Sequence, residues 1–163
     1  MRQAPGILRR LAALPYEGLI LLALGLIATF PVAGLRGMTL SGIPHLILQT
    51  YLFAVMATYF MWLWCHGGQT LAMKTWRFRV ETQGGARLSI KRAALRLISA
   101  LLFYGPACVG IVLLFFPKRV HFLLTMWLFV PMLATIWWAK FDSDRQFLHD
   151  RIAGTRLADT EKN

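Results

Sequence analysis

Long apolar stretches alternate with short polar segments along the chain, and four of these stretches contain no charged residue. They cover residues 18–35, 46–65, 97–117 and 120–139. Each is close to the roughly 20 residues that a helix needs to cross about 30 Å of hydrocarbon, and none alternates as the strands of a membrane barrel do. The pattern predicts an all-α membrane protein with four transmembrane helices, both termini cytoplasmic, in a single domain, residues 1–163. The helices are expected at about 16–35, 46–65, 97–117 and 120–139, followed by a cytoplasmic C-terminal tail at 140–163.

The basic residues between the apolar runs predict the orientation of the chain. Loops that remain in the cytoplasm carry most of the lysine and arginine of a membrane protein. With both termini in the cytoplasm, three basic residues precede the first run, seven lie between the second and third, and five follow the fourth. Only Arg36, Lys118 and Arg119 would then face outside. The chain carries a net charge of +11, but much of it lies beside membrane helices. We therefore expect anionic lipid headgroups as its partner, and no nucleic acid.

The cytoplasmic loop TWRFRVETQGGARLSI has the alternation typical of β-strands. Apolar and charged residues alternate from Trp76 to Glu81, and again after the Gly84–Gly85 pair. Period-two alternation around two glycines predicts a short β-hairpin, with Thr75–Glu81 paired to Ala86–Ile90. We expect Trp76 and Phe78 to be buried at the level of the lipid headgroups. The next residues include Lys91, Arg92 and Arg96, a basic collar where the third helix begins.

Motifs for enzymatic chemistry are missing from the sequence. There is no Walker loop, GxSxG, HExxH or dinucleotide fingerprint. The four histidines share no metal-ligand spacing with Cys65 or Cys108, and both cysteines lie inside apolar runs. We therefore expect a protein that is not an enzyme and that has no metal site and no cofactor.

Three segments of the chain together resemble the RDD family of small bacterial membrane proteins. They are RRLAALPYEGLILL at residues 9–22, GGQTLAMKTWRFRVETQGGARLS at residues 67–89 and FLHDRIAGTRL at residues 147–157. The family is named for one arginine and two aspartates, and the corresponding positions here hold Arg10, Glu17 and Asp150. The supporting motif residues are Gly68, Gln69, Thr70, Lys74, His149 and Arg151.

The resemblance covers nearly the whole chain, with three departures from the usual family pattern. Glu17 stands where the family has aspartate, Pro15 replaces an aliphatic residue beside it, and Ala72 replaces a glycine. The resemblance implies a multi-pass protein of the bacterial cytoplasmic (inner) membrane. The family is suspected of transport, but its molecular function is generally unassigned.

Glu17 has two interpretations that differ in where the first helix begins. If Pro15 is the first helical residue, Glu17 lies in the first turn, where the helix dipole favours a carboxylate. If the helix begins near Leu11, Glu17 is buried about 9 Å deep and needs a partner or a proton. For the second case we hypothesise a charged cluster in which Glu17 accepts hydrogen bonds from Lys74 or Arg151, while Arg10 meets Asp150.

Two functions from different classes are consistent with these features. The first is transport of an ion or small solute, which the family's reputation and the mid-helix prolines Pro106 and Pro131 favour. The second is a non-catalytic accessory or assembly subunit, acting as a homo-oligomer or within a larger membrane complex. Small size, four helices and the missing reaction motifs favour this alternative.

Overall fold

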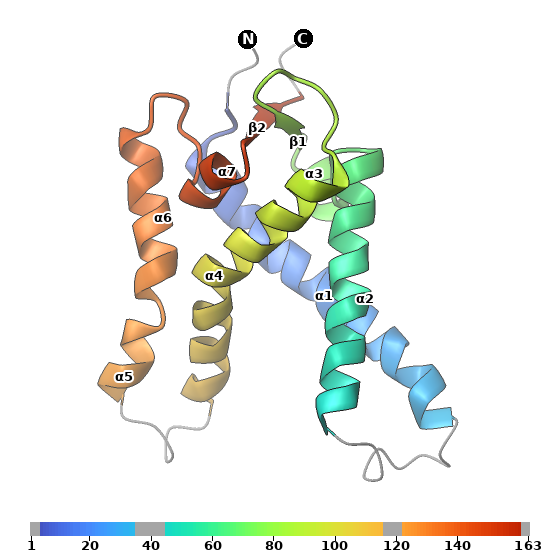
Figure 1. Cartoon of the computed structure of the whole chain (residues 1–163). Helices are drawn as coiled ribbons and strands as arrows, with labels where there is room; N and C mark the ends of the chain where they lie inside the picture. The colour runs from blue at the N-terminus through green and yellow to red at the C-terminus, as the bar shows by residue number, and fades with distance from the viewer. Residues whose placement is uncertain (1–3, 35–44, 116–121, 161–163) are drawn as a thin grey trace.

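Seven helices and two strands make up the part of the chain that the computed structural model describes, residues 4–34, 45–115 and 122–160. The longest helices are α1 (Ile7–Gly34), α2 (His45–His66) and α4 (Ile90–Leu114), with 28, 22 and 25 residues. The shorter elements are α3 (Leu71–Thr75), β1 (Phe78–Thr82), α5 (Phe122–Trp127), α6 (Val130–Phe141), α7 (Leu148–Ile152) and β2 (Thr155–Asp159). The long helices extend in one direction from an end that holds α3, α7 and both strands (Figure 1).

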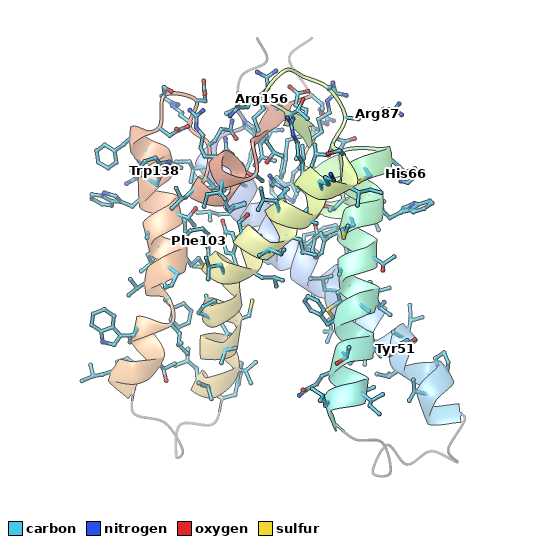
Figure 2. The ribbon with its side chains drawn as sticks, in the orientation of Figure 1. Tyr51, His66, Arg87, Phe103, Trp138 and Arg156 are labelled. Carbon is cyan, nitrogen blue, oxygen red and sulfur yellow. The ribbon has the colours of Figure 1, made fainter. Side chains whose placement is uncertain are left out.

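Three helices, α1, α2 and α4, are long and apolar enough to cross a membrane. Their apolar side chains are largely exposed, as expected for surfaces that lipid covers. Tyr51 on α2 and Trp138 on α6 are two of the exposed aromatic residues (Figure 2). The prediction of a mostly helical membrane protein is therefore confirmed for three candidate spans.

The fourth apolar run is divided between two helices, α5 and α6. The amides of Leu128 and Phe129 bond to the carbonyl oxygens of Thr125 and Met126, three residues earlier, which is tighter than α-helical bonding. Pro131, which has no amide hydrogen to donate, lies in the first turn of α6. The break between α5 and α6 therefore falls just before this proline.

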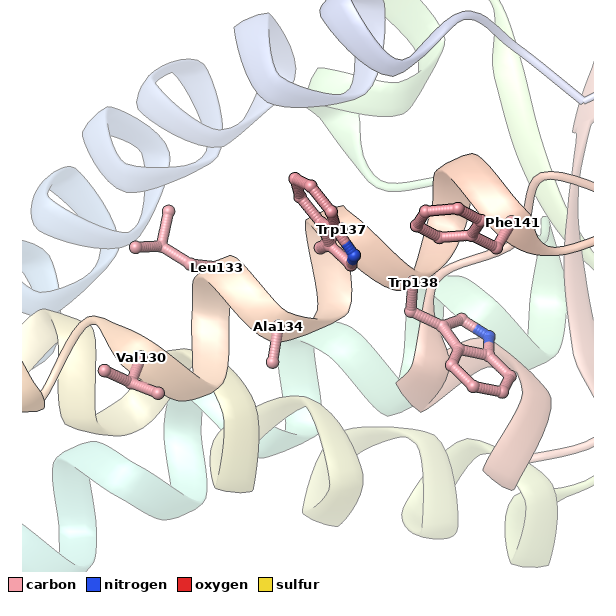
Figure 3. Close-up of a pocket in the computed structure, with 6 residues that line it drawn as sticks. All are labelled: Val130, Leu133, Ala134, Trp137, Trp138 and Phe141. Carbon is pink, nitrogen blue, oxygen red and sulfur yellow. The ribbon is translucent and has the colours of Figure 1, made fainter.

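The outward side of α6 carries a shallow apolar groove. It is lined by Val130, Leu133, Ala134, Trp137, Trp138 and Phe141, which project from successive turns of this helix (Figure 3). No charged side chain lines it.

Helix α1 begins well before the position that the Pro15 interpretation requires. It starts at Ile7, and Pro15 lies inside it. Glu17 is thus ten residues beyond the first helical residue, about 15 Å along the axis. The interpretation of Glu17 as a residue of the first turn is wrong, because the helix begins eight residues before Pro15, about two turns further toward the N-terminus.

The two strands form an antiparallel sheet between the segment that follows α3 and the C-terminal segment. Val80 of β1 lies opposite Leu157 of β2, and Phe78 lies opposite Asp159. The predicted local hairpin is therefore wrong. After β1 the chain turns at Thr82, whose amide bonds to the Ala86 carbonyl, and helix α4 then begins at Ile90. The alternation correctly marked a strand, but the residues it pairs with are 73 to 81 positions away in sequence.

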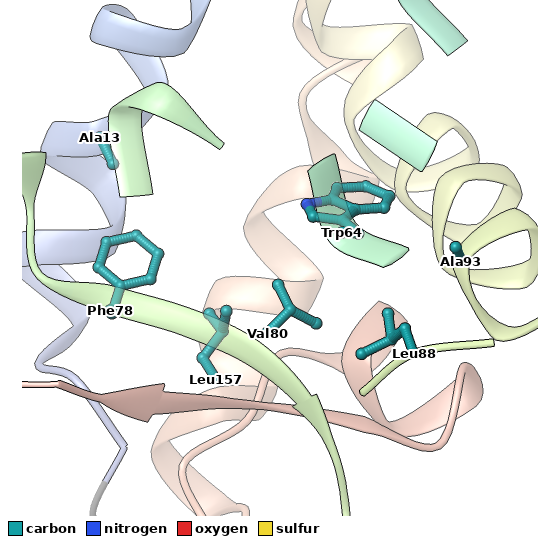
Figure 4. Packing of buried hydrophobic residues seen from close by; sticks show 7 residues of the cluster. All are labelled: Ala13, Trp64, Phe78, Val80, Leu88, Ala93 and Leu157. Carbon is teal, nitrogen blue, oxygen red and sulfur yellow. The ribbon is translucent and has the colours of Figure 1, made fainter. Parts of the chain in front are cut away.

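The main buried apolar cluster lies at this end of the molecule, beneath the sheet. It joins both strands to three long helices (Figure 4). Its members are Ala13, Trp64, Phe78, Val80, Leu88, Ala93 and Leu157. Phe78 is only 2% exposed, so it packs inside the protein rather than among headgroups, while the partly buried Trp76 packs against the cluster.

Helix α4 packs closely at Gly110 against Leu128 and Phe129, the two residues between α5 and α6. A Cβ atom at this position would lie 2.9 Å from the ring of Phe129, so the residue must be small. Helix α4 also changes direction part-way along its length (Figure 1), and Pro106 lies inside it. A proline inside a helix is a common cause of such a bend.

We predict that Gly110→Ala lowers the thermal unfolding midpoint, because overpacking against Phe129 costs about 1–3 kcal/mol and outweighs the roughly 1 kcal/mol helix preference of alanine. Gly18→Ala is the matched control, since no neighbouring atom lies within 4 Å of a Cβ there, and it should raise or maintain the midpoint. Intrinsic tryptophan fluorescence in detergent measures both. Equal shifts for the two variants would contradict the close contact.

Candidate functional site

A glycine and a glutamine fasten the segment between α2 and α3 to strand β1. Gly68 has a φ of +68°, and its carbonyl oxygen accepts a hydrogen bond of 2.6 Å from the Val80 amide. A Cβ atom at this position would lie 2.6 Å from the Val80 oxygen, so only glycine fits. The side-chain amide of Gln69 donates to the Phe78 carbonyl at 2.9 Å. These bonds place the following residue, Thr70, against α1.

Glu17 accepts two hydrogen bonds from neighbouring elements. The hydroxyl of Tyr59 in α2 donates to Oε1 at 2.8 Å, and the hydroxyl of Thr70 donates to Oε2 at 2.5 Å. Thr70 is fully buried, and its Oγ1 also accepts a 3.3 Å bond from the Met73 amide as the N-cap of α3. The carboxyl group therefore connects α1, α2 and α3, and its bonds come from neutral hydroxyls.

A buried ion pair joins α4 to the C-terminal segment. Nη1 of Arg96 contacts Oδ1 of Asp150, and both residues are almost completely buried. The same Nη1 donates to the Thr155 hydroxyl at 2.9 Å. The guanidinium of Arg96 also lies over the ring of Trp64, 5.1 Å from its centroid. One arginine thus connects α2, α4, α7 and β2.

Arg10 belongs to the same buried region but has different hydrogen-bond partners. Its Nε donates to the carbonyl of Pro5 at 2.9 Å and its Nη1 to the carbonyl of Arg145 at 2.7 Å. The guanidinium lies over the ring of Phe147, 5.0 Å from the centroid. It therefore attaches the start of α1 to the segment between α6 and α7.

His149 lies between these groups. Its ring packs edge-on against Tyr104 and stacks on Phe147, and its Nε2 is 3.5 Å from Oδ1 of Asp150. Burial lowers the pKa of His149 to about 4, because Asp150 only partly offsets the cost of charging a buried imidazole. For Asp150 burial opposes ionisation, but the surrounding positive charges, that of Arg96 first, and the hydrogen bond from Arg96 together outweigh it and lower the pKa. At neutral pH the neutral imidazole of His149 therefore lies beside the ionised carboxylate of Asp150.

Several buried polar atoms of Arg10, Arg96, His149 and Asp150 have no hydrogen-bond partner within the described protein. They are Arg10 Nη2, Arg96 Nε, His149 Nδ1 and Asp150 Oδ2. Buried polar groups of this kind are usually satisfied by protein atoms or by bound water. We define the polar cluster as Arg10, Arg96, His149, Asp150 and Thr155.

Comparison with known families identifies the chain. The profile of the RDD family matches residues 4–154, which is nearly its whole length. The protein belongs to the RDD family. No curated protein and no solved structure matches it.

The RDD positions are brought together at one end of the molecule, but not in the predicted pairs. Arg10 and Asp150 lie in the polar cluster, yet Asp150 pairs with Arg96 rather than with Arg10. Glu17 bonds to Tyr59 and Thr70 rather than to Lys74 or Arg151.

The two basic residues proposed as partners of Glu17 lie elsewhere in this RDD protein. Arg151 pairs with Asp142 and Asp144, at 2.8 and 2.7 Å. The hydrogen bond from Arg151 and backbone amides lower the pKa of Asp142 even though burial opposes it. Lys74 is exposed in the last turn of α3. Within the described residues no group of three or more histidine, cysteine or acidic side chains could hold a metal ion.

Three residues of the polar cluster and of the Glu17 environment, Arg96, Thr155 and Tyr59, were not predicted from the sequence. Arg96 was assigned to the basic collar, although apolar residues flank it on both sides, a context in which a buried arginine needs an acidic partner. Tyr59 lies in a long apolar run, and no sequence signal separates it from an interfacial tyrosine. The position of Arg96 could therefore have been found, whereas that of Tyr59 could not.

Titration of His149 should make the stability of this RDD protein depend on pH. The unfolded imidazole has a pKa near 6.5 and the folded one about 4, so the unfolded state binds more protons between these values and stability falls as pH is lowered. We expect a loss on the order of 2 kcal/mol between pH 7.5 and pH 5. His149→Gln should remove most of this slope in thermal unfolding, while His66→Gln, at an exposed position, should keep it. Identical slopes in all three proteins would show that His149 is not responsible.

Proposed function

We propose that this RDD protein moves a small cation or proton across the cytoplasmic membrane and that Glu17 is the group that binds it. The observation that carries this proposal is the environment of Glu17. It lies about 15 Å along α1, within a candidate span, and accepts hydrogen bonds from Tyr59 and Thr70. Ionisable residues inside membrane spans usually mark ion or proton pathways.

The charge balance around Glu17 supports a positive occupant. Within the described residues, no lysine, arginine or histidine forms an ion pair with this carboxylate. Its neighbours are hydroxyl groups, which can donate a hydrogen bond to a carboxylate through their O–H or coordinate a hard cation through their oxygen. A carboxylate between hydroxyls can therefore exchange a proton or a metal cation without breaking a salt bridge.

The broken fourth apolar run also supports transport. We infer that α5 and α6 together form a fourth span, since both pack against α4 and their residues 122–141 would reach about 30 Å as a helix. The break at Leu128 and Phe129 leaves backbone groups outside regular helical bonding. Discontinuous helices of this kind occur at ion sites in transporters.

The orientation that we propose places both termini and the sheet in the cytoplasm. The start of α1, strand β2 and the loop that contains β1 all lie at the same end (Figure 1). That end carries most of the basic residues, which favours the cytoplasmic side. Glu17 is then closer to the cytoplasmic surface than to the outer one and would be reached from inside.

A flux assay with Glu17 variants tests the proposed function. Purified protein is reconstituted into liposomes that contain a pH-sensitive dye, and a sodium or potassium gradient is imposed. Glu17→Gln should reduce flux at least tenfold, because it removes the exchangeable charge but keeps the side-chain size. Glu17→Asp should retain part of the flux, since the RDD pattern has aspartate here.

Asp144→Asn is the matched control for the flux assay. It also removes one carboxylate charge, but the side chain of Asp144 is 62% exposed and far from α1 in sequence. We expect its flux to equal that of the unchanged protein. Unchanged flux in Glu17→Gln, with all variants eluting as folded protein, would contradict the role of Glu17.

The alternative function is a non-catalytic subunit of a larger membrane complex or a homo-oligomer. The apolar groove on α6, with Trp137 and Trp138 exposed, is the observation that favours it. If no cation or proton flux occurs and cross-linking in native membranes captures a defined partner through α6, this alternative replaces transport.

A further inference from the structure

Every acidic side chain in the described part of the chain forms an ion pair or a hydrogen bond with another side chain. Some basic residues are partners in these ion pairs, and others are not. The hydrogen bonds and ion pairs join Arg9 to Asp159, Arg156 and Arg79 to Glu81, Arg96 to Asp150, Arg151 to Asp142 and Asp144, and two hydroxyls to Glu17. These contacts use every aspartate and glutamate that the structure describes. The basic side chains at the start of α4 are not among these contacts.

Three basic side chains without an acidic partner in the described residues lie close together in sequence at the start of α4. They are Arg87, Lys91 and Arg92, and all three are exposed. Helix α4 begins at Ile90 and has no acidic residue in its first turn. The positive end of the helix dipole therefore adds to the positive charge of Lys91 and Arg92, and no acidic side chain in this turn offsets either of them.

The same face of α4 continues into the membrane as an apolar stripe. Lys91, Leu95, Ile98 and Leu102 follow at spacings of four, three and four residues, so they lie on one side of the helix. Leu95 is 44%, Ile98 63% and Leu102 66% exposed. The stripe is thus uncovered by protein and is headed by a basic group.

We propose that this face of α4 binds one anionic phospholipid of the cytoplasmic leaflet. Its phosphate would lie against Arg87, Lys91 and Arg92, and one acyl chain would follow Leu95, Ile98 and Leu102. This inference concerns a different face from Glu17 and does not depend on transport.

The occupant is a lipid rather than a soluble anion, because the exposed aliphatic side chains follow directly after the basic residues on the same side of α4. A free phosphate would use only the basic residues and would leave the three exposed aliphatic side chains without a partner. A zwitterionic lipid would fill the stripe but would bring its own positive charge close to Lys91 and Arg92. The combination of net positive charge and exposed aliphatic surface fits a lipid with a negatively charged headgroup.

Lipid binding to the full-length protein tests this proposal. Native mass spectrometry in detergent measures retention of phosphatidylglycerol and of phosphatidylcholine with identical acyl chains. We expect the unchanged protein to bind phosphatidylglycerol at least fivefold more tightly. The double variant Lys91→Gln with Arg92→Gln should lose this preference, and its phosphatidylcholine binding should not change. Ile98→Ser should weaken binding of both lipids.

The matched control removes two positive charges elsewhere on the same end of the protein. Lys140→Gln with Arg145→Gln changes the net charge equally, at and beyond the C-terminal end of α6. Trp138 of α6 and Arg87 lie on opposite sides of the molecule (Figure 2). This control should keep the preference for phosphatidylglycerol. Equal loss in both double variants, or no preference in the unchanged protein, would overturn the site. Binding of glycerol phosphate alone with the same affinity would show that the site takes a soluble anion instead.

Discussion

The buried ion pair between Arg96 and Asp150 is the interaction on which the end of the molecule that holds the sheet depends. Asp150 is 0% and Arg96 3% exposed, so each charge would be very costly to bury alone. Their contact ties α4 to α7, and the bond from Arg96 to Thr155 extends it to β2. Strand β2 then pairs with β1, which covers the apolar cluster above the long helices. This ion pair, together with the strand pairing and the Arg9–Asp159 contact, positions the C-terminal segment relative to the long helices.

This arrangement divides the molecule into two parts with different stabilising forces. At the end that holds the sheet, apolar burial, ion pairs and hydrogen bonds hold the elements together. The segment Gly68–Thr70 is bonded to strand β1 through Gln69 and to Glu17 through Thr70, so the sheet positions the partner of Glu17. Further along, α1, α2 and α4 expose most of their apolar side chains, which is stable only in lipid or against other helices. Glu17 lies where these two parts meet. The proposed cation or proton site is therefore held by hydrogen bonds to elements that the sheet end positions.

Much of the helical architecture could be predicted from the sequence, because uncharged runs of about 20 residues have few alternatives. The alternation from Trp76 to Glu81 likewise identified a strand. Its partner could not be predicted, since helices α4, α5, α6 and α7 lie between β1 and β2 and pairing at that separation depends on the tertiary fold. The same holds for Asp150, whose nearest arginine in sequence is Arg151 but whose ion-pair partner is Arg96. The sequence shows which residues carry a charge and where they lie along the chain, but only the packed structure shows how they pair.

A double-mutant cycle on Arg96 and Asp150 tests this account most directly. The free energy of unfolding in detergent is measured for Arg96→Met, Asp150→Asn and the double variant. Each single change leaves one buried charge without its partner and should cost about 3–5 kcal/mol. The double variant removes both charges and should be more stable than either single variant, with a coupling energy above about 1 kcal/mol. Additive losses, or single variants as stable as the unchanged protein, would contradict the claim that this ion pair fastens the C-terminal segment to the helices.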